Sequence, residues 1–393
     1  MRGFGIPQLV WAYESHTDMM ARALKVDPIE FRRKNILREG RPQATGTAMK
    51  DAAIEAVLDR LALRMNWNDA FDRGAGPIKR GRGVAIGFKA SISPTTSIAI
   101  LNVAADGSCT LYCSTVDMGQ GSDTAMAQIA AEVLDLTIER ITLVHPDTDV
   151  TPYDMGTLGS RSTFHMGNAV KRAAEEARGK IAALVAELGL PAGTNVPVAE
   201  LFRRKYGMQA GNIIGTGSYV PSYISPERGT GQSTDVTPYW MTGGTGAEVE
   251  VDTETGHVRI ARLVNVADVG RPINPRIVET QLSGAALMQL GFTMFEKMEL
   301  DAGQVTNASL ADYKIPGFHD LPREIANEAV EAEQTGGPFG AKGVGETGTL
   351  SVSPAIANAI DDAVGVRLTE LPLNAEAVYR ALRAARNEPL AEE

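Results

Sequence analysis

Periodic apolar positions predict six helices in this chain. After residue 121, for example, Met126, Ile129 and Val133 recur at three- and four-residue spacing, so they share one face of a helix. The last of the six is bounded by Ser353 as its N-cap and by Gly365 at its C-terminal end. The predicted helices cover residues 9–25, 49–64, about 122–134, 168–188, 274–296 and 353–364.

Runs of apolar and β-branched residues predict strands that are joined in two hairpins. The first hairpin joins residues 97–104 to 108–115 through the turn dipeptide Asp106-Gly107. The second hairpin spans residues 245–267. In both places a hairpin, a loop and a helix follow one another, which indicates two similar subdomains.

This mixture of elements is typical of an α+β fold with mixed sheets and packed helices, because it lacks a regular βαβ alternation. We place a domain boundary near residue 75, in a polar, glycine-containing stretch, and divide the remainder into subdomains 76–240 and 241–393. Residues 207–246 show no clear period. That segment is too long for an ordinary connection, so it either carries function or contains structure that the pattern does not reveal.

Charge and composition exclude several classes of protein. The formal net charge of −10 disfavours binding to nucleic acids or to anionic membranes, which requires basic surfaces. No apolar run is long enough to span a membrane, and the first residues do not resemble a secretory signal. The two cysteines are too few for an iron–sulfur cluster, and the five histidines lack the spacing of metal ligands. We therefore expect a cytoplasmic protein.

The segment from Gly336 to Gly348 is the first candidate for chemistry. It holds six glycines in thirteen residues, together with Lys342 and Glu346. Clustered glycines allow the backbone to approach a ligand closely, and a carboxylate held among them could act as a general base. The Walker phosphate-loop pattern is broken, because glycine follows the lysine. A flexible surface loop is the alternative.

Four other segments could bind a ligand. Two loops that precede helices offer free N–H groups, hydroxyls and an amide, although each could be a simple helix entry. Gln281 is a lone amide on an apolar helix face, and the N-terminal segment places arginine and phenylalanine among glycines. A structural glutamine and a frayed terminus are the respective alternatives. The candidate residues are Gly119, Gln120 and Gly121; Gly159, Ser160, Arg161, Ser162 and Thr163; Gln281; and Arg2 and Phe4.

The order of these motifs resembles the second half of the molybdenum-binding subunit of xanthine dehydrogenases and aldehyde oxidases. The matching elements are Arg-Gly-Phe-Gly-x-Pro-Gln, Met-Gly-Gln-Gly, Gly-Ser-Arg-Ser-Thr, Ile-Asn-Pro followed by Gln-x-x-Gly-Ala, and Gly-Ala-Lys-Gly-Val-Gly-Glu, and they extend from residue 1 to about residue 365. The resemblance implies that residues 1–75 end a first molybdopterin-binding domain and that residues 76–393 form a second. It also implies molybdopterin with molybdenum, in some members as the cytosine dinucleotide.

The resemblance implies a role for each matching residue. Glu346 is expected to be the catalytic base beside molybdenum, Phe4 to contact the substrate, and no side chain to bind the metal directly. The residues expected to bind the cofactor are Arg2, Gly119, Gln120, Gly121, Gly159, Ser160, Arg161, Ser162, Thr163, Gln281 and Gly345.

The chain departs from the family because the first half of the usual subunit is absent. Either a separate chain supplies it or the reading frame is truncated, and we expect activity only with partner subunits. The [2Fe-2S] and FAD centres of the family are expected on such partners, since neither a ferredoxin-type cysteine set nor a flavin fingerprint is present. The resemblance implies a hydroxylase that acts on an aromatic N-heterocycle or an aldehyde with water as the oxygen source. A non-catalytic cofactor-binding or assembly protein of the same fold is the alternative.

Overall fold

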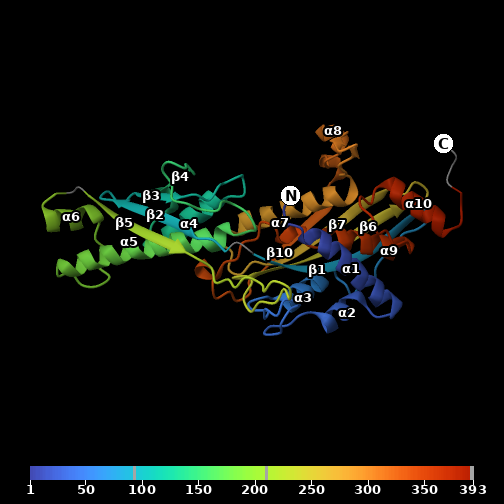
Figure 1. The fold of residues 1–393 in the computed structure, drawn as a ribbon, viewed down its shortest axis with the longest axis horizontal. Coiled ribbons are helices and arrows are strands. Elements are labelled where there is room, and N and C mark those ends of the chain that lie inside the picture. The colour runs from blue at the N-terminus through green and yellow to red at the C-terminus, as the bar shows by residue number, and fades with distance from the viewer. Residues whose placement is uncertain (92–93, 209–210, 390–393) are drawn as a thin grey trace.

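Two four-stranded mixed sheets form the framework of the chain, which the computed structural model describes over residues 1–91, 94–208 and 211–389. The predicted α+β class is confirmed. The sheets lie side by side along the longest axis of the molecule (Figure 1). The first has the order β1 (Ile78–Ala90), β6 (Trp240–Asp252), β7 (Val258–Asp268) and β10 (Glu324–Val330), and the second the order β4 (Ile141–Val144), β3 (Cys109–Cys113), β2 (Ser97–Ala104) and β5 (Asn212–Tyr219).

Both sheets are built to the same plan. Each contains a central hairpin, β6–β7 or β2–β3, with an antiparallel strand on one side and a parallel strand on the other. In each sheet a helix crosses the antiparallel edge strand so closely that only glycine fits. An added Cβ at Gly81 would lie 2.1 Å from the carbonyl oxygen of Ala359, and one at Gly215 would lie 2.0 Å from that of Ala173. This shared plan agrees with the expectation of two similar units.

The expected boundary at residue 240 coincides with the first residue of β6, but the expected subdomain 76–240 includes β1, which belongs to the other sheet. β1 was assigned to the first subdomain, yet it pairs with β6 along its whole length, from Ile78 opposite Asp252 to Ala90 opposite Trp240. The second sheet is therefore an insertion between β1 and β6. The pattern could not reveal this pairing, because it joins segments about 160 residues apart in the chain.

Helices cover both faces of the first sheet. Val57 and Leu61 of α3 pack over Gly244 on one face, whereas α9 and the turn before it pack on the other. α1 lies against α9 and β1, so the N-terminal helices belong to this unit. The helices of this part are α1 (Ile6–Ala23), α2 (Pro28–Asn35), α3 (Ile54–Arg64), α7 (Pro275–Met294), α9 (Val352–Val364) and α10 (Ala375–Ala385).

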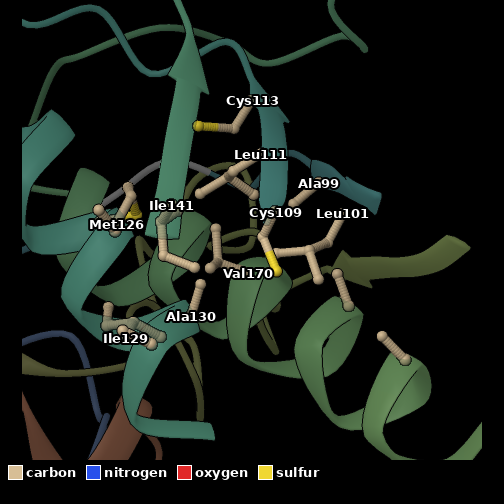
Figure 2. Packing of buried hydrophobic residues seen from close by; sticks show 14 of the residues in the cluster. Ala99, Leu101, Cys109, Leu111, Cys113, Met126, Ile129, Ala130, Ile141 and Val170 are labelled. Carbon is tan, nitrogen blue, oxygen red and sulfur yellow. The ribbon is translucent and has the colours of Figure 1, made fainter. Parts of the chain in front are cut away.

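The second sheet buries one face beneath two helices. Alternate residues of β2, namely Ala99, Leu101 and Val103, point into a core with Met126 and Val170 of the covering helices (Figure 2). Both cysteines lie in the same core as free thiols. The helices of this unit are α4 (Ser122–Leu134), α5 (Gly167–Glu187) and α6 (Val198–Tyr206).

The segment at 207–246 contains structure that its pattern did not show, because it includes β5 and the start of β6. A small excursion after α7 projects from the body (Figure 1) and holds β8 (Leu300–Asp301), β9 (Gln304–Val305) and α8 (Leu310–Tyr313). Within the described ranges, no helix combines the length and the apolar character needed to cross a bilayer.

Candidate active site

Glu346 is held at a point where three distant parts of the chain meet. It follows the glycine loop 343–345 and precedes the short turn that leads into α9. One carboxylate oxygen, Oε1, accepts a hydrogen bond of 3.0 Å from the N–H of Gly3. The other, Oε2, lies 2.9 Å from Nζ of Lys89 and 3.5 Å from Oγ of Ser160. Only 9% of the residue is exposed, so the carboxylate is largely desolvated and well oriented.

Arg2 links the N-terminal segment to this loop. Its guanidinium donates to the carbonyl oxygens of Gln281 and Gly345, at 3.2 and 3.1 Å. Burial lowers the pKa of Arg2, and the charge of Glu346 opposes that effect. Phe4 is not brought into the site, since its side chain is 83% exposed on this chain. Its expected contact with the substrate therefore stays a prediction.

Residues 117–121, the Gln120 loop, are shaped by a carboxylate that accepts hydrogen bonds from backbone N–H groups. Asp117 accepts from the N–H of Gly119 at 2.7 Å and of Asp123 at 3.0 Å, and these bonds hold its pKa below the usual value although burial acts against them. Gly121 begins α4 with φ of +78°, and a Cβ there would lie 2.7 Å from Ile277 of α7. Close approach of α4 and α7 thus requires glycine at this position.

Residues 159–163, the Ser160 loop, contribute their backbone and hydroxyl groups to the candidate site, but not the side chain of their arginine. Ser160, Ser162 and Thr163 line the cleft described below, and Oγ of Ser160 accepts from the N–H of Glu346 at 3.0 Å. Arg161 is fully buried and pairs with Asp154, with Nη1 2.7 Å from each carboxylate oxygen. The guanidinium is thus committed to a structural ion pair, and the expectation that Arg161 binds the cofactor stays a prediction.

The two remaining glycines of these loops act through their backbone conformation. Gly159 has φ of +57°, and its carbonyl oxygen accepts from Oγ of Ser91 at 3.0 Å. Gly119 has φ of +99°. Neither lines the cleft in the described part of the chain, so both shape the loops that do.

A cleft of about 660 Å³, counting the space open to solvent, brings most of the expected residues together. The N-terminal ends of α4, of α7 and of the π-turn that precedes α5 all border it. One N–H at the start of α4 and one at the start of α7 are already bound by Asp117 and Asn274, and the positive dipole ends of the converging helices favour an anion. The lining residues include Gln120, Gly121, Ser122, Thr157, Ser160, Ser162, Thr163, Asn274, Ile277, Gln281, Gly343 and Gly345.

Gln281 supplies an unsatisfied polar group at this cleft. It lies in the second turn of α7, is 8% exposed, and its side-chain Oε1 has no hydrogen-bond partner among the described residues. A buried amide without a partner is costly, so the arrangement is typical of a group that awaits a ligand. No cluster of three or more histidine, cysteine or acidic side chains that could hold a metal ion occurs in the described ranges.

Sequence reasoning did not identify Lys89 or the start of α7 as parts of the site. Lys89 lies near the end of β1, where a charged residue follows a run of buried apolar positions. That contrast was a usable signal, although the pattern could not show which carboxylate the lysine would meet. Asn274 caps α7 by accepting from the N–H of Ile277 at 3.1 Å and lines the cleft as well.

Comparison with known proteins gives the family. A model described as a molybdopterin cofactor-binding domain matches residues 57–322, and a second model with the same description matches residues 1–36. The chain belongs to this family, that of the molybdenum-binding subunits of xanthine dehydrogenase and aldehyde oxidoreductase. The resemblance inferred from the motifs is thereby confirmed.

Individual members of the molybdopterin-binding family match almost the whole chain. The xanthine dehydrogenase molybdenum-binding subunit of Escherichia coli O157:H7 is 30% identical over 98% of this chain and 53% of its own length. The nicotine 6-hydroxylase large subunit of Paenarthrobacter nicotinovorans is 29% identical over 97% of this chain and 50% of its own. The solved structure of the aldehyde oxidoreductase of Desulfovibrio desulfuricans superimposes on this chain with a TM-score of 0.85 and 30% sequence identity. The superposition covers 97% of this chain and 41% of the oxidoreductase chain. This chain thus spans about half the length of these curated relatives.

The residues that line the cleft fit the molybdopterin cofactor of this family. The cofactor carries a phosphate, and three helix N-termini converge where such an anion would be bound. Neutral hydroxyl and amide groups suit the heteroatoms of a pterin, and the unsatisfied amide of Gln281 offers a further contact. When bound, the cofactor would supply the molybdenum redox centre, while the protein orients it.

Proposed function

We propose that this chain is the C-terminal half of the molybdenum-cofactor subunit of a hydroxylase, with Glu346 as its catalytic base. The observation that carries the proposal is the position of Glu346, whose carboxylate is desolvated, oriented by Gly3 and Lys89, and joined through Ser160 to a loop of the cleft. A base held in this way is ready to accept a proton without first reorganising.

Each loop has a separate task in this proposal. Gln120, Ser122, Ser160, Ser162 and Thr163 would hold the cofactor through neutral donors and helix ends. Gln281 would contact the cofactor through its side-chain amide, whose buried Oε1 is free to accept a hydrogen bond. Arg2 would hold the loop of Glu346 against α7, because its guanidinium donates to the carbonyl oxygens of Gly345 in that loop and of Gln281 in α7. Molybdenum chemistry then supplies the oxidation, with water as the oxygen source.

The substrate class is an aromatic N-heterocycle or an aldehyde. This part of the proposal is supported by the family relatives, which include a nicotine 6-hydroxylase subunit and an aldehyde oxidoreductase. We further propose that partner subunits carry the [2Fe-2S] and FAD centres. The cytosine dinucleotide form of the cofactor and a cytoplasmic location belong to the same proposal. The two free buried thiols are consistent with a reducing compartment.

The test is metal content and turnover of the complex purified from its native host. Glu346→Gln removes the base but keeps the size of the side chain, so we expect molybdenum to be retained and turnover to fall at least about a hundredfold. Glu331→Gln, which alters an exposed glutamate, should leave both unchanged. Full turnover by Glu346→Gln would refute its role as base.

The same measurement separates the alternative of a non-catalytic assembly protein. A wild-type complex that binds molybdenum but oxidises none of a panel of N-heterocycles and aldehydes would favour that alternative. An active complex without molybdenum would overturn the assignment to molybdenum chemistry altogether.

A further inference from the structure

Lys89 is a buried cation whose place in the fold is explained by one carboxylate. The residue is 4% exposed, and a lysine so deeply buried is rare unless it is paired. Its Nζ lies 2.9 Å from Oε2 of Glu346 and donates to the carbonyl oxygen of Ala90 at 3.1 Å. Lys89 belongs to β1 and Glu346 to the loop before α9, so folding alone brings the two together.

The carboxylate of Glu346 is therefore fixed from two sides, by a backbone N–H and by an ammonium group. Gly3 donates an N–H to Oε1, and Lys89 places a full positive charge beside Oε2. An opposite charge at this distance stabilises a carboxylate most where water is scarce. Without Lys89, Oε1 would keep the Gly3 contact, but Oε2 would keep only the longer contact of 3.5 Å with Oγ of Ser160.

We infer that Lys89 is a positioning residue for Glu346: it holds the carboxylate in one orientation, next to Gly345, which lines the cleft. The inference rests on the proposed function.

Two variants of Lys89 distinguish a loss of the orientation of Glu346 from a general loss of protein stability. Lys89→Met keeps an unbranched side chain but removes the charge, and we expect kcat per bound molybdenum to fall about a hundredfold with KM little changed, because a displaced catalytic group slows the chemical step. Lys89→Arg keeps a cation and should recover most of kcat. Arg32→Met is the matched control. It removes another buried cation, which pairs with Glu14 at 2.7 Å away from the cleft, and should leave kcat per molybdenum unchanged.

A second readout is independent of turnover. In the purified complex, the urea-unfolding midpoints of wild type, Lys89→Met, Glu346→Gln and the double variant form a double-mutant cycle. We expect Lys89→Met to lower the midpoint because it leaves a buried carboxylate unpaired. The double variant should be less destabilised than the sum of the two single changes. Additive effects would refute the pairing.

The outcomes distinguish this inference from the proposed function. If Glu346→Gln abolishes turnover but Lys89→Met retains full kcat per molybdenum, the role of Lys89 fails and that of Glu346 stands. If Glu346→Gln is fully active, the proposed function fails, and the positioning role fails with it, whatever the unfolding cycle shows. An equal loss of kcat in Lys89→Met and Lys89→Arg would also overturn the positioning role, because the charge would then be irrelevant.

Discussion

Gly343 is predicted to tolerate no side chain, because the glycine loop and the Ser160 loop touch backbone to backbone. A Cβ at Gly343 would lie 1.7 Å from the carbonyl oxygen of Ser160 and 2.7 Å from Oη of Tyr239. Real Cβ contacts are essentially never below 3.0 Å, so the two loops would have to separate by about 1.3 Å. That carbonyl also accepts a hydrogen bond of 2.7 Å from Tyr239, whose ring stacks on Phe164. The strain cannot be relieved by rotating one side chain.

We therefore expect Gly343→Ala to lower the free energy of unfolding by about 3 kcal/mol or more, the upper range for overpacking a well-filled site. Gly345→Ala is the matched control two residues away. Its Cβ would meet only Oγ of Ser160, at 3.6 Å, which is an ordinary contact. We expect Gly345→Ala to change stability by no more than about 0.5 kcal/mol.

The assay is urea unfolding of both variants, followed by tryptophan fluorescence and compared by midpoint at equal slope. In the purified complex, molybdenum content reports whether the displaced Ser160 loop still binds the cofactor. Similar midpoints for Gly343→Ala and Gly345→Ala would refute the reasoning, because the loop contact would then be softer than its geometry implies.

Three further predictions concern groups around the site. Asp154→Ala should destabilise the chain by about 3–5 kcal/mol in urea unfolding, because it leaves the fully buried Arg161 unpaired; a change below about 1 kcal/mol would contradict this. The pKa of Asp117 is lowered on folding, so its contribution to stability is present above its ordinary pKa and is lost as pH falls through the lowered value. Asp117→Asn should flatten this acidic part of the melting-temperature profile, and an unchanged profile would argue against it. Burial raises the pKa of Cys109 to about 11 and of Cys113 to about 12, so neither thiol should react with a disulfide reagent at pH 8 until the protein unfolds.

Local pattern was enough to predict most of the helices and both hairpins. Apolar period and end signals placed α4, α5, α7 and α9 within a few residues of their observed bounds, because amphipathic spacing and capping act over one or two turns. The order of the glycine motifs likewise indicated the family, and the cleft does gather Gln120, Ser160 and Gln281. These features depend on neighbours in the chain, which a sequence displays directly.

What the tertiary structure alone decided is the set of long-range partners. Only the fold pairs β1 with β6, which moves a whole strand out of the expected subdomain. Only the fold brings Lys89 within reach of Glu346. It also buries the ion pair of Arg161 with Asp154, although these two residues lie only seven positions apart. The function of a buried charged side chain depends on the opposite charge that folding places beside it, because water does not screen the pair there. Residue types and spacing do not specify that neighbour when it lies hundreds of positions away.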